Sequence, residues 1–213
     1  METTATRILL VRHGQSQGNA ERRFGGHSPT PLSELGLAQA EVTARALAAE
    51  GVTAIYSSDL LRALQTAEPL ARETGLEVCR TSALRERNVG LMEGLTFEEA
   101  AESFPDEYGA LLRRDFEHVL PGGESYRQLL DRAAAELDRA IELHRGGTVA
   151  AFSHTGTICV LALHLMGALD APHLKPVWIS SANCGVTRIE IQHGGLIRFL
   201  RMNDTRHLLG LQT

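Results

Sequence analysis

Short apolar runs alternate with longer stretches of helical periodicity along most of the chain. The runs ILLV at 8–11 and VAAF at 149–152 contain no polar residue, which is typical of strands that are buried on both faces. We predict a strand at each such run, namely at 7–11, 52–56, 77–79, 148–152, 185–191 and 196–202. Because helical segments separate most of these strands, the pattern indicates an α/β fold with a mostly parallel sheet.

The segment 32–51 has the periodicity of an amphipathic helix. Its apolar positions recur three and four residues apart, so they share one face of the helix. We assign Leu37, Ala40, Ala44 and Leu47 to this face, and we expect Gly51 to end the helix.

Two further segments, 58–75 and 125–147, carry the start and stop signals of helices. Side-chain oxygens at the start can cap free backbone N–H groups, and glycine at the end tolerates a left-handed conformation. The predicted signals are Ser58 or Asp59 and Gly75 for the first helix, and the capping box of Ser125 and Gln128 followed by Gly146-Gly147 for the second.

These elements fit a single three-layer domain that spans residues 1–213, with helices on both faces of the sheet. The last two predicted strands, 185–191 and 196–202, are joined by QHGG and resemble a hairpin, so we expect one antiparallel strand. Residues 92–124 follow the alternation least well. We interpret them as an excursion of two short helices and the turn PGGES over one end of the sheet, where it would cover a substrate.

Composition narrows the classes of function. The 213 residues are 43% hydrophobic, which suits one well-filled core, and the formal charge of −5 argues against nucleic acid as the main partner. The first residues are too polar for a secretion signal, and no apolar segment is long enough for a membrane span. Three distant cysteines, Cys79, Cys159 and Cys184, indicate reduced thiols in a cytoplasmic protein rather than disulfides or a zinc site. The oligomeric state stays open between monomer and dimer.

Unusual polar residues follow three of the predicted strands. Arg12 and His13 end the first strand, Arg62 begins the helix after the second, and His154 follows the fourth. Ligands of open α/β sheets bind at the carboxyl ends of the strands, where these side chains would meet. Arginine forks match phosphate oxygens, and helix N-termini add backbone donors. A lone strand-end histidine is more often structural, but two histidines and two arginines together predict a phosphate pocket.

Other kinds of phosphate site lack their sequence patterns here. There is no glycine-rich loop that ends in Lys-Ser or Lys-Thr, no cysteine followed at short range by an arginine in a phosphate-binding loop, and no cluster of aspartates and histidines for metal ions. We therefore predict nucleophilic catalysis by a histidine, with no metal and no cofactor.

Five motifs occur in order along the chain: LLVRHGQSQGN, SSDLLRALQTAE, LRERNVGLMEGLT, PGGES and SHTGTI. Together they resemble the histidine phosphatase superfamily, in its phosphoglycerate-mutase-like branch and of the broad-specificity phosphatase type. The resemblance runs from residue 7 to about residue 207. It implies an α/β domain that transfers a phosphoryl group through a phosphohistidine.

The resemblance also implies roles for individual residues. His13 matches the nucleophile, and Glu86 matches the acid that protonates the leaving oxygen. Arg12, Arg62 and His154 match residues that grip the transferred phosphoryl group, His154 being also counted with the catalytic set. The same phosphate pocket would be lined by Asn19, Gly25, Gly26 and Thr155.

Physical arguments support these roles independently. A histidine between two permanent cations should have a lowered pKa and be neutral near pH 7, as a nucleophile must be. A carboxylic acid close to a bound dianion holds its proton to higher pH, which suits Glu86 to general-acid work. Glu93 is the competitor, since spacing alone cannot separate the two. The family pattern favours Glu86, and we interpret Glu93 as a carboxylate that stabilises a turn.

Three classes of function remain to be weighed: a phosphatase, a mutase and an idle phosphate-binding protein. The complete set of candidate residues argues against the third. Val89 stands where the mutases carry a tyrosine, which favours a hydrolase, while Cys159 replaces an arginine frequent in the phosphatases. Arg113 and Arg114 are either solvated or the pair with which mutases hold a substrate carboxylate. We therefore predict a metal-independent phosphomonoester hydrolase of small phosphorylated metabolites, with a cofactor-dependent phosphoglycerate mutase as the alternative.

Overall fold

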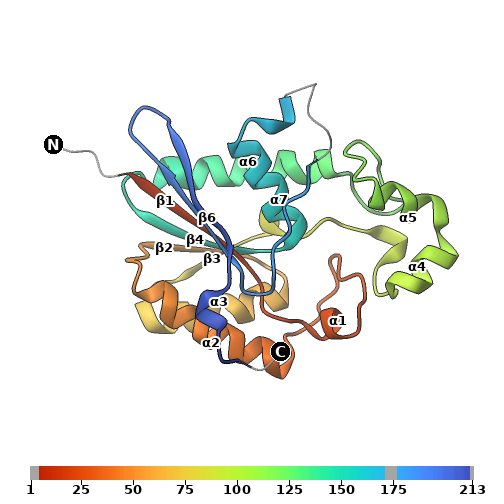
Figure 1. Cartoon of the computed structure of the whole chain (residues 1–213), viewed down its shortest axis with the longest axis horizontal. Helices are drawn as coiled ribbons and strands as arrows, with labels where there is room; N and C mark the ends of the chain where they lie inside the picture. Colours follow the sequence, from red (N-terminus) through yellow and green to blue (C-terminus); the bar gives the residue numbers. More distant parts are fainter. Residues whose placement is uncertain (1–4, 171–176, 212–213) are drawn as a thin grey trace.

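The computed structural model describes residues 5–170 and 177–211, which form a six-stranded sheet with helices on both faces (Figure 1). The strands lie in the order β3-β2-β4-β1-β5-β6. Their bounds are β1 Thr6–Arg12, β2 Ala54–Ser58, β3 Val78–Thr81, β4 Thr148–Ser153, β5 Val186–Ile191 and β6 Ile197–Asp204. Strands β1 to β4 pair with one another in parallel, and β5 runs antiparallel to both of its neighbours, β1 and β6. The predicted fold class, including its single antiparallel strand, is confirmed.

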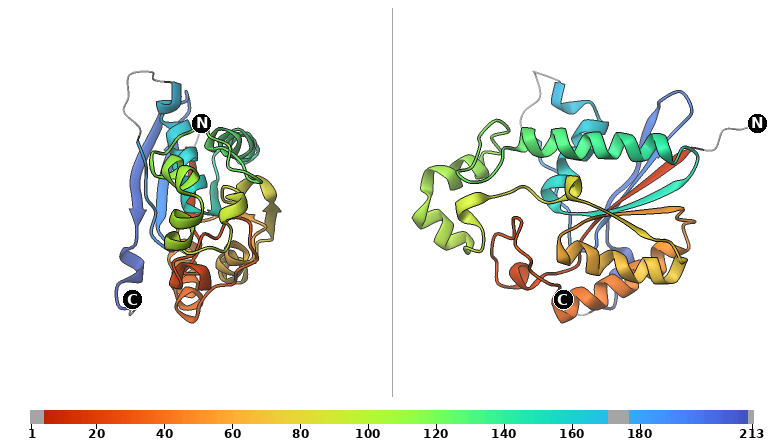
Figure 2. Two further views of the ribbon diagram at one scale, coloured as in Figure 1. Left: turned by 90° about the vertical axis from the view of Figure 1, so that its right-hand side faces the viewer. Right: turned by 180° about the vertical axis from the view of Figure 1, so that it is seen from behind.

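The helices form the two outer layers of the fold (Figure 2). Helices α2 (Glu34–Ala48) and α3 (Leu61–Thr74) cover one face of the sheet, and α6 (Tyr126–Leu143) and α7 (Thr155–Leu165) cover the other. Strand β1 contributes to both layers of the core, because Ile8 and Leu10 pack with residues of α6 and α7. Leu9 and Val11 pack with residues of α2 and α3 on the opposite face. Burial on both faces explains its uninterrupted apolar run.

Several predicted helix ends are wrong in detail. Helix α2 ends at Ala48, three residues before Gly51, and Leu37 is 47% exposed instead of buried with Ala40. The side chains of Ser58 and Asp59 do not cap α3, whose N-cap is Leu60.

Both predicted caps of α3 are engaged elsewhere. The Ser58 hydroxyl lies 2.9 Å from His154 Nε2, and Arg85 donates two hydrogen bonds of 2.6 Å to the Asp59 carboxylate. The left-handed Gly75 at the end of α3 and the capping box of Ser125 at the start of α6 are confirmed. Helix α6 ends at Leu143, ahead of Gly146-Gly147.

The remaining helices lie beyond the carboxyl ends of the parallel strands. Helix α1 (Gln17–Ala20) follows β1, and α4 (Phe97–Ser103) and α5 (Pro105–Leu112) project from the same end of the sheet (Figure 1). In the described ranges, 5–170 and 177–211, no helix is both long and apolar enough to cross a membrane. All three cysteines are free thiols, of which only Cys79 is exposed.

Candidate active site

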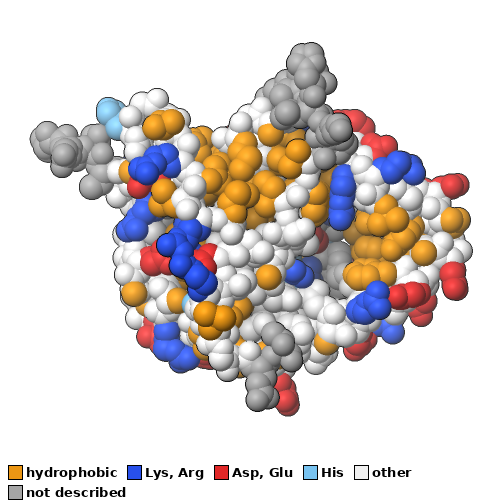
Figure 3. Space-filling view, viewed as in Figure 1, with side chains coloured by type: hydrophobic (Ala, Val, Ile, Leu, Met, Phe, Trp, Pro, Cys, Tyr) orange, Lys and Arg blue, Asp and Glu red, His pale blue; other side chains and the backbone are white. Residues whose placement is uncertain are grey.

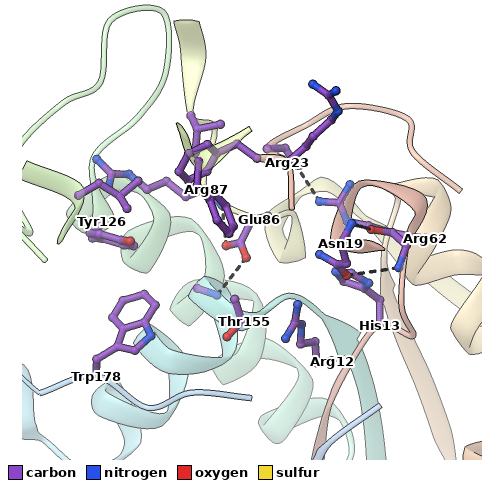
Figure 4. A pocket seen from close by; sticks show the side chains of 18 of the residues that line it. Arg12, His13, Asn19, Arg23, Arg62, Glu86, Arg87, Tyr126, Thr155 and Trp178 are labelled. Carbon is purple, nitrogen blue, oxygen red and sulfur yellow. Dashed lines mark hydrogen bonds between the residues drawn. The ribbon is translucent and has the colours of Figure 1, made fainter. Parts of the chain in front are cut away.

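A cavity of about 350 Å³ opens at the carboxyl end of the sheet, between the body of the molecule and the α4–α5 segment. Figure 3 shows the surface hollowed there, with arginine side chains at the margin and apolar side chains on the far wall. The close view separates a polar end around His13 from an aromatic end around Trp178, with Glu86 between them (Figure 4). Predicted residues that line the cavity are Arg12, His13, Asn19, Gly25, Gly26, Arg62, Glu86, Arg114 and Thr155.

His13 is only 4% exposed, at the floor of the polar end. Its Nδ1 lies 2.6 Å from the carbonyl oxygen of Gly14, which can only accept a hydrogen bond, so Nδ1 carries the proton. The lone pair is therefore on Nε2. Burial lowers the pKa of His13 well below 6.5, and the charges of Arg62 and Arg12 lower it further. The direction agrees with our expectation, but burial contributes more than the arginines.

Gly14 holds this end of the chain against helix α2. A Cβ atom at Gly14 would lie 2.6 Å from the carbonyl oxygen of Gly36, and one at Gly36 would lie 2.0 Å from that of Gln15. Both positions therefore require glycine, because the obstacle is backbone. The Gly14 N–H also donates to Thr66 Oγ1 at 3.0 Å. The glycine after His13 thus fixes the main chain that orients the imidazole.

Arg12 and Arg62 bring two cations to the polar end. Arg12 Nη1 donates to the carbonyl of Ser181 at 2.5 Å, whereas its buried Nε has no partner among the described residues. Arg62 is 2% exposed and donates to the carbonyls of Gly26 at 2.8 Å and Ser28 at 3.0 Å, so it orders the Gly25-Gly26 turn. Burial lowers the pKa of Arg62 to about 10, which leaves it charged at neutral pH.

Asn19 is held beside His13 by a residue that the sequence did not single out. Asn183 Nδ2 donates to the carbonyl of His13 at 3.1 Å and to Asn19 Oδ1 at 3.0 Å. Asn19 Oδ1 also accepts the N–H of Ser16 in the capping box of α1. The oxygen of the Asn19 amide is thereby occupied, and its NH₂ group is the part available to a phosphate.

Glu86 and Glu93 are separated clearly by their contacts. Glu86 lines the cavity, and its carboxylate accepts the N–H of Arg87 at 2.8 Å and that of Gly156, in the first turn of α7, at 3.0 Å (Figure 4). Glu93 is not part of the lining and accepts the N–H of His27 at 3.0 Å. This contact with the main chain after the Gly25-Gly26 turn is the kind that a turn-stabilising carboxylate makes, as we interpret Glu93.

His154 lies behind His13 and does not line the cavity. It is fully buried, and the two imidazole centroids are 5.1 Å apart. Burial lowers the pKa of His154 well below 6.5, helped by the charge of Arg62. His154 is therefore neutral, so it can pack against His13 without adding a positive charge beside Arg62.

The aromatic end of the cavity was not foreseen from the sequence. Arg87 lies 4.1 Å from the centroid of the Tyr126 ring and Arg114 lies 4.0 Å from that of Trp178, while the two aromatic rings contact each other. Arg113, the neighbour of Arg114, is absent from the lining. Arg87 directly follows Glu86 in the motif LRERNVG, which is the one sequence signal that could have drawn attention to it.

No group of three or more His, Cys, Asp or Glu side chains within residues 5–170 and 177–211 is arranged to hold a metal ion. At the polar end of the cavity, Arg12 and Arg62 supply positive charge beside His13.

Comparison with known proteins assigns the class. Residues 8–205 match the family model of the histidine phosphatase superfamily, branch 1. A metal-independent phosphoserine phosphatase of Arabidopsis thaliana is 37% identical over 177 residues, which are 82% of this chain and 74% of that protein. A probable phosphoglycerate mutase GpmB of Salmonella paratyphi B is 33% identical over 189 residues, 87% of this chain and 85% of its own.

A solved structure shares the fold. The mycobacterial glucosyl-3-phosphoglycerate phosphatase, determined with VO3, superposes with a TM-score of 0.82 at 31% identity over 93% of this chain and 99% of its own. The chain is thus an enzyme of a class that transfers phosphoryl groups and shares this α/β fold. It belongs to the histidine phosphatase superfamily, branch 1.

Proposed function

We propose that this enzyme is a metal-independent phosphomonoester hydrolase that acts through a phosphohistidine at His13. The observation that carries the proposal is the neutral imidazole at the cavity floor, with its proton fixed on Nδ1, between the guanidinium groups of Arg12 and Arg62. A nucleophile and two cations at one point suit attack on phosphorus, because the transition-state charge lies on the phosphoryl oxygens. The name of the Arabidopsis relative, a metal-independent phosphatase, supports the same chemistry.

In the first step, the Nε2 lone pair of His13 forms a bond to phosphorus as the bond to the alcohol oxygen breaks. The leaving oxygen takes the proton of the Glu86 carboxyl group and departs as the alcohol. The Gly14 carbonyl continues to accept the hydrogen bond from Nδ1–H of His13, so it stabilises the positive charge on the phosphorylated imidazole. Arg12, Arg62, Asn19 and the N–H group of Thr155, the first residue of α7, would hold the phosphoryl oxygens.

In the second step, the Glu86 carboxylate takes a proton from a water molecule, whose oxygen attacks phosphorus. The P–N bond breaks, and inorganic phosphate and neutral His13 are released. The N–H groups of Arg87 and Gly156 hold the Glu86 carboxyl group at the side of the cavity from which it faces the leaving oxygen in the first step and the water molecule in the second.

The alcohol part of the substrate would occupy the aromatic end, under residues 92–124. Arg87 and Arg114 line this end and have no carboxylate within ion-pair distance in the described parts of the chain. Arg87 is 3% exposed, and a buried cation without a counter-ion is costly. The site therefore favours an alcohol part that carries an acidic group beside an apolar or planar surface. The names of the relatives, phosphoserine and glucosyl-3-phosphoglycerate phosphatases, fit an acidic alcohol.

The three free thiols fit a cytoplasmic location, because thiols stay reduced in that compartment.

Trapping the covalent intermediate tests the proposal. The enzyme is mixed with a labelled phosphomonoester, for example ³²P-labelled 3-phosphoglycerate, and the reaction is quenched rapidly under alkaline conditions. This should give an acid-labile, base-stable adduct that maps to His13. The variant His13→Ala should form none. His164→Ala is the control, because His164 lies far along α7 and pairs with Asp138. An adduct that persists in His13→Ala would remove His13 from this role.

A mutase is the second candidate, because Arg114 lines the cavity and GpmB is named a probable phosphoglycerate mutase. With 3-phosphoglycerate as substrate, a phosphatase accumulates inorganic phosphate. A mutase instead forms 2-phosphoglycerate, faster when a bisphosphoglycerate primer is added. We expect phosphate release, and rapid interconversion of the isomers would assign the enzyme to the mutases.

A further inference from the structure

The main chain that carries Glu86 is held by an unusual set of side chains. Residues 83–86 comprise the end of the short 3-10 helix Ser82–Leu84 and the two residues after it, and they belong to no strand, so their carbonyls lack a regular hydrogen-bond ladder. All four carbonyls nevertheless accept hydrogen bonds from side chains of other elements. The donors are Arg132 for Ala83, Arg85 and Glu86, Ser153 for Leu84, Thr157 also for Arg85, and His27 also for Glu86.

Arg132 of α6 makes three of these six contacts. Its Nη1 donates to the carbonyls of Ala83 at 2.7 Å and Arg85 at 2.9 Å, and its Nη2 donates to that of Glu86 at 2.8 Å. The other edge of the guanidinium donates to the Glu124 carboxylate, from Nη2 at 2.6 Å and from Nε at 3.2 Å. The planar guanidinium group of Arg132 thus donates hydrogen bonds to these three carbonyls and one carboxylate in a fixed geometry.

Glu124, in the turn PGGES, holds the opposite side of the same segment. Its carboxylate accepts the N–H of Asn88 at 2.9 Å, and its own N–H donates to the Asn88 carbonyl at 3.0 Å. Backbone packing is tight there, because a Cβ atom at Gly123 would lie 2.4 Å from that carbonyl. Glu124 and Arg132 therefore fix the chain on both sides of Glu86.

We propose that Arg132 and Glu124 are a positioning pair that sets the carboxyl group of Glu86 against the leaving oxygen. Neither residue lines the cavity, so they act through Glu86 and not on the substrate. The proposal rests on the proposed function, in which Glu86 is the general acid. It also gives a role to the PGGES motif, whose glutamate has no other assignment in the mechanism.

The variant Arg132→Lys tests the pair. A lysine keeps the charge but has a single nitrogen, which cannot reach three carbonyls and a carboxylate at once. With an alkyl phosphate, kcat should fall by about 10–10²-fold, the scale of a misplaced catalytic group. With p-nitrophenyl phosphate the loss should be much smaller, because that leaving group hardly needs a proton. Arg139→Lys is the matched control, since Arg139 lies on the same helix, is 55% exposed and forms its ion pair with Glu136, away from residues 83–86.

Two outcomes would overturn the proposal. Equal losses of kcat on both substrates would mean a general structural role. Additive losses in the double variant Arg132→Lys/Glu86→Gln would mean that Arg132 does not act through Glu86, because a positioning residue loses its effect when the group that it positions is replaced.

A readout without turnover separates this proposal from the proposed function. In Arg132→Lys, amide hydrogen exchange should become faster at Arg87 and Gly156, whose N–H groups donate to Glu86, while α3 keeps its protection. Unchanged exchange at these two amides overturns the positioning role even if the enzyme proves to be a phosphatase. Conversely, a missing adduct on His13 refutes the proposed function and leaves this measurement valid.

Discussion

The substitution Arg62→Lys keeps a positive charge at this position but removes the planar guanidinium group, so it tests the hydrogen-bonding geometry of Arg62 separately from its charge. Arg62 uses both terminal nitrogens, at 2.8 Å and 3.0 Å, to hold the carbonyls of Gly26 and Ser28. A lysine offers one nitrogen on a longer flexible stem, so it cannot order the turn and face a phosphate at once. We expect kcat/KM to fall by about 10²–10³-fold, the effect of losing one oxyanion donor, which corresponds to ~2.7–4 kcal/mol.

Burial adds a dependence on pH. Burial lowers the pKa of Arg62 to about 10, so the arginine stays charged through neutral and mildly alkaline pH. Lysine starts from an ordinary pKa of about 10.4, two units below arginine, so the same burial brings its deprotonation close to the working range. The defect of Arg62→Lys should therefore deepen as pH rises, while the wild-type enzyme shows no matching loss.

The assay is kcat/KM for one alkyl phosphate between about pH 6 and pH 9, the range in which such a lysine would titrate. Arg72→Lys is the control, because Arg72 lies on the same helix, is 63% exposed and pairs with Glu41 on the surface. That control should stay within about twofold of wild type, as expected for an exposed ion pair. Activity of Arg62→Lys close to wild type would refute the reasoning, since it would mean that Arg62 does not hold the phosphoryl group.

Three further predictions follow from the site. Glu86→Gln should lower kcat for an alkyl phosphate by about 10²–10⁴-fold, the scale of a lost general acid, and should cost much less with p-nitrophenyl phosphate; equal losses would contradict its role. Prolonged EDTA treatment should leave turnover unchanged, because Arg12 and Arg62 supply the positive charge; activity restored only by Mg²⁺, Mn²⁺ or Zn²⁺ would disprove the mechanism. The free energy of unfolding should decrease as pH falls below about 6.5. Burial lowers the pKa values of His13 and His154 in the folded protein, so below this pH the unfolded chain binds protons at these two residues and the folded chain does not. Urea denaturation should show this slope reduced in His13→Gln; an unchanged slope would mean that His13 titrates normally in the folded protein.

The sequence predicted best those parts of the site that lie at the ends of buried strands. Strands β1 and β4 are buried on both faces, so their apolar runs and the polar residues that follow, Arg12, His13 and His154, were visible in the pattern. Glu86 belongs to no strand and needed the family motif. Its competitor Glu93 could be separated from it only by the contacts of the folded chain.

Residues outside regular elements were missed because long-range contacts bring them to the site. Asn183 donates a hydrogen bond to the carbonyl of His13, which lies 170 positions earlier in the sequence, and no local pattern predicts such a contact. Arg113 and Arg114 could not be told apart, because the difference arises from the left-handed backbone of Arg114, with φ of 56°, just after α5 ends. Leu37 fitted the helical period, but the close approach of Gly36 to Gln15 decides which residues of α2 face the core.

The contact between Gly14 and Gly36 has a consequence for the cost of catalysis. Where backbone touches backbone and no side chain can be added, the chain that holds His13 has little room to rearrange during phosphoryl transfer. Groups that are already in place contribute their full electrostatic effect with almost no reorganisation energy. Adaptation to a new alcohol is then left to α4 and α5 across the cavity, so that selection can alter which phosphoester is accepted while the reacting centre stays the same.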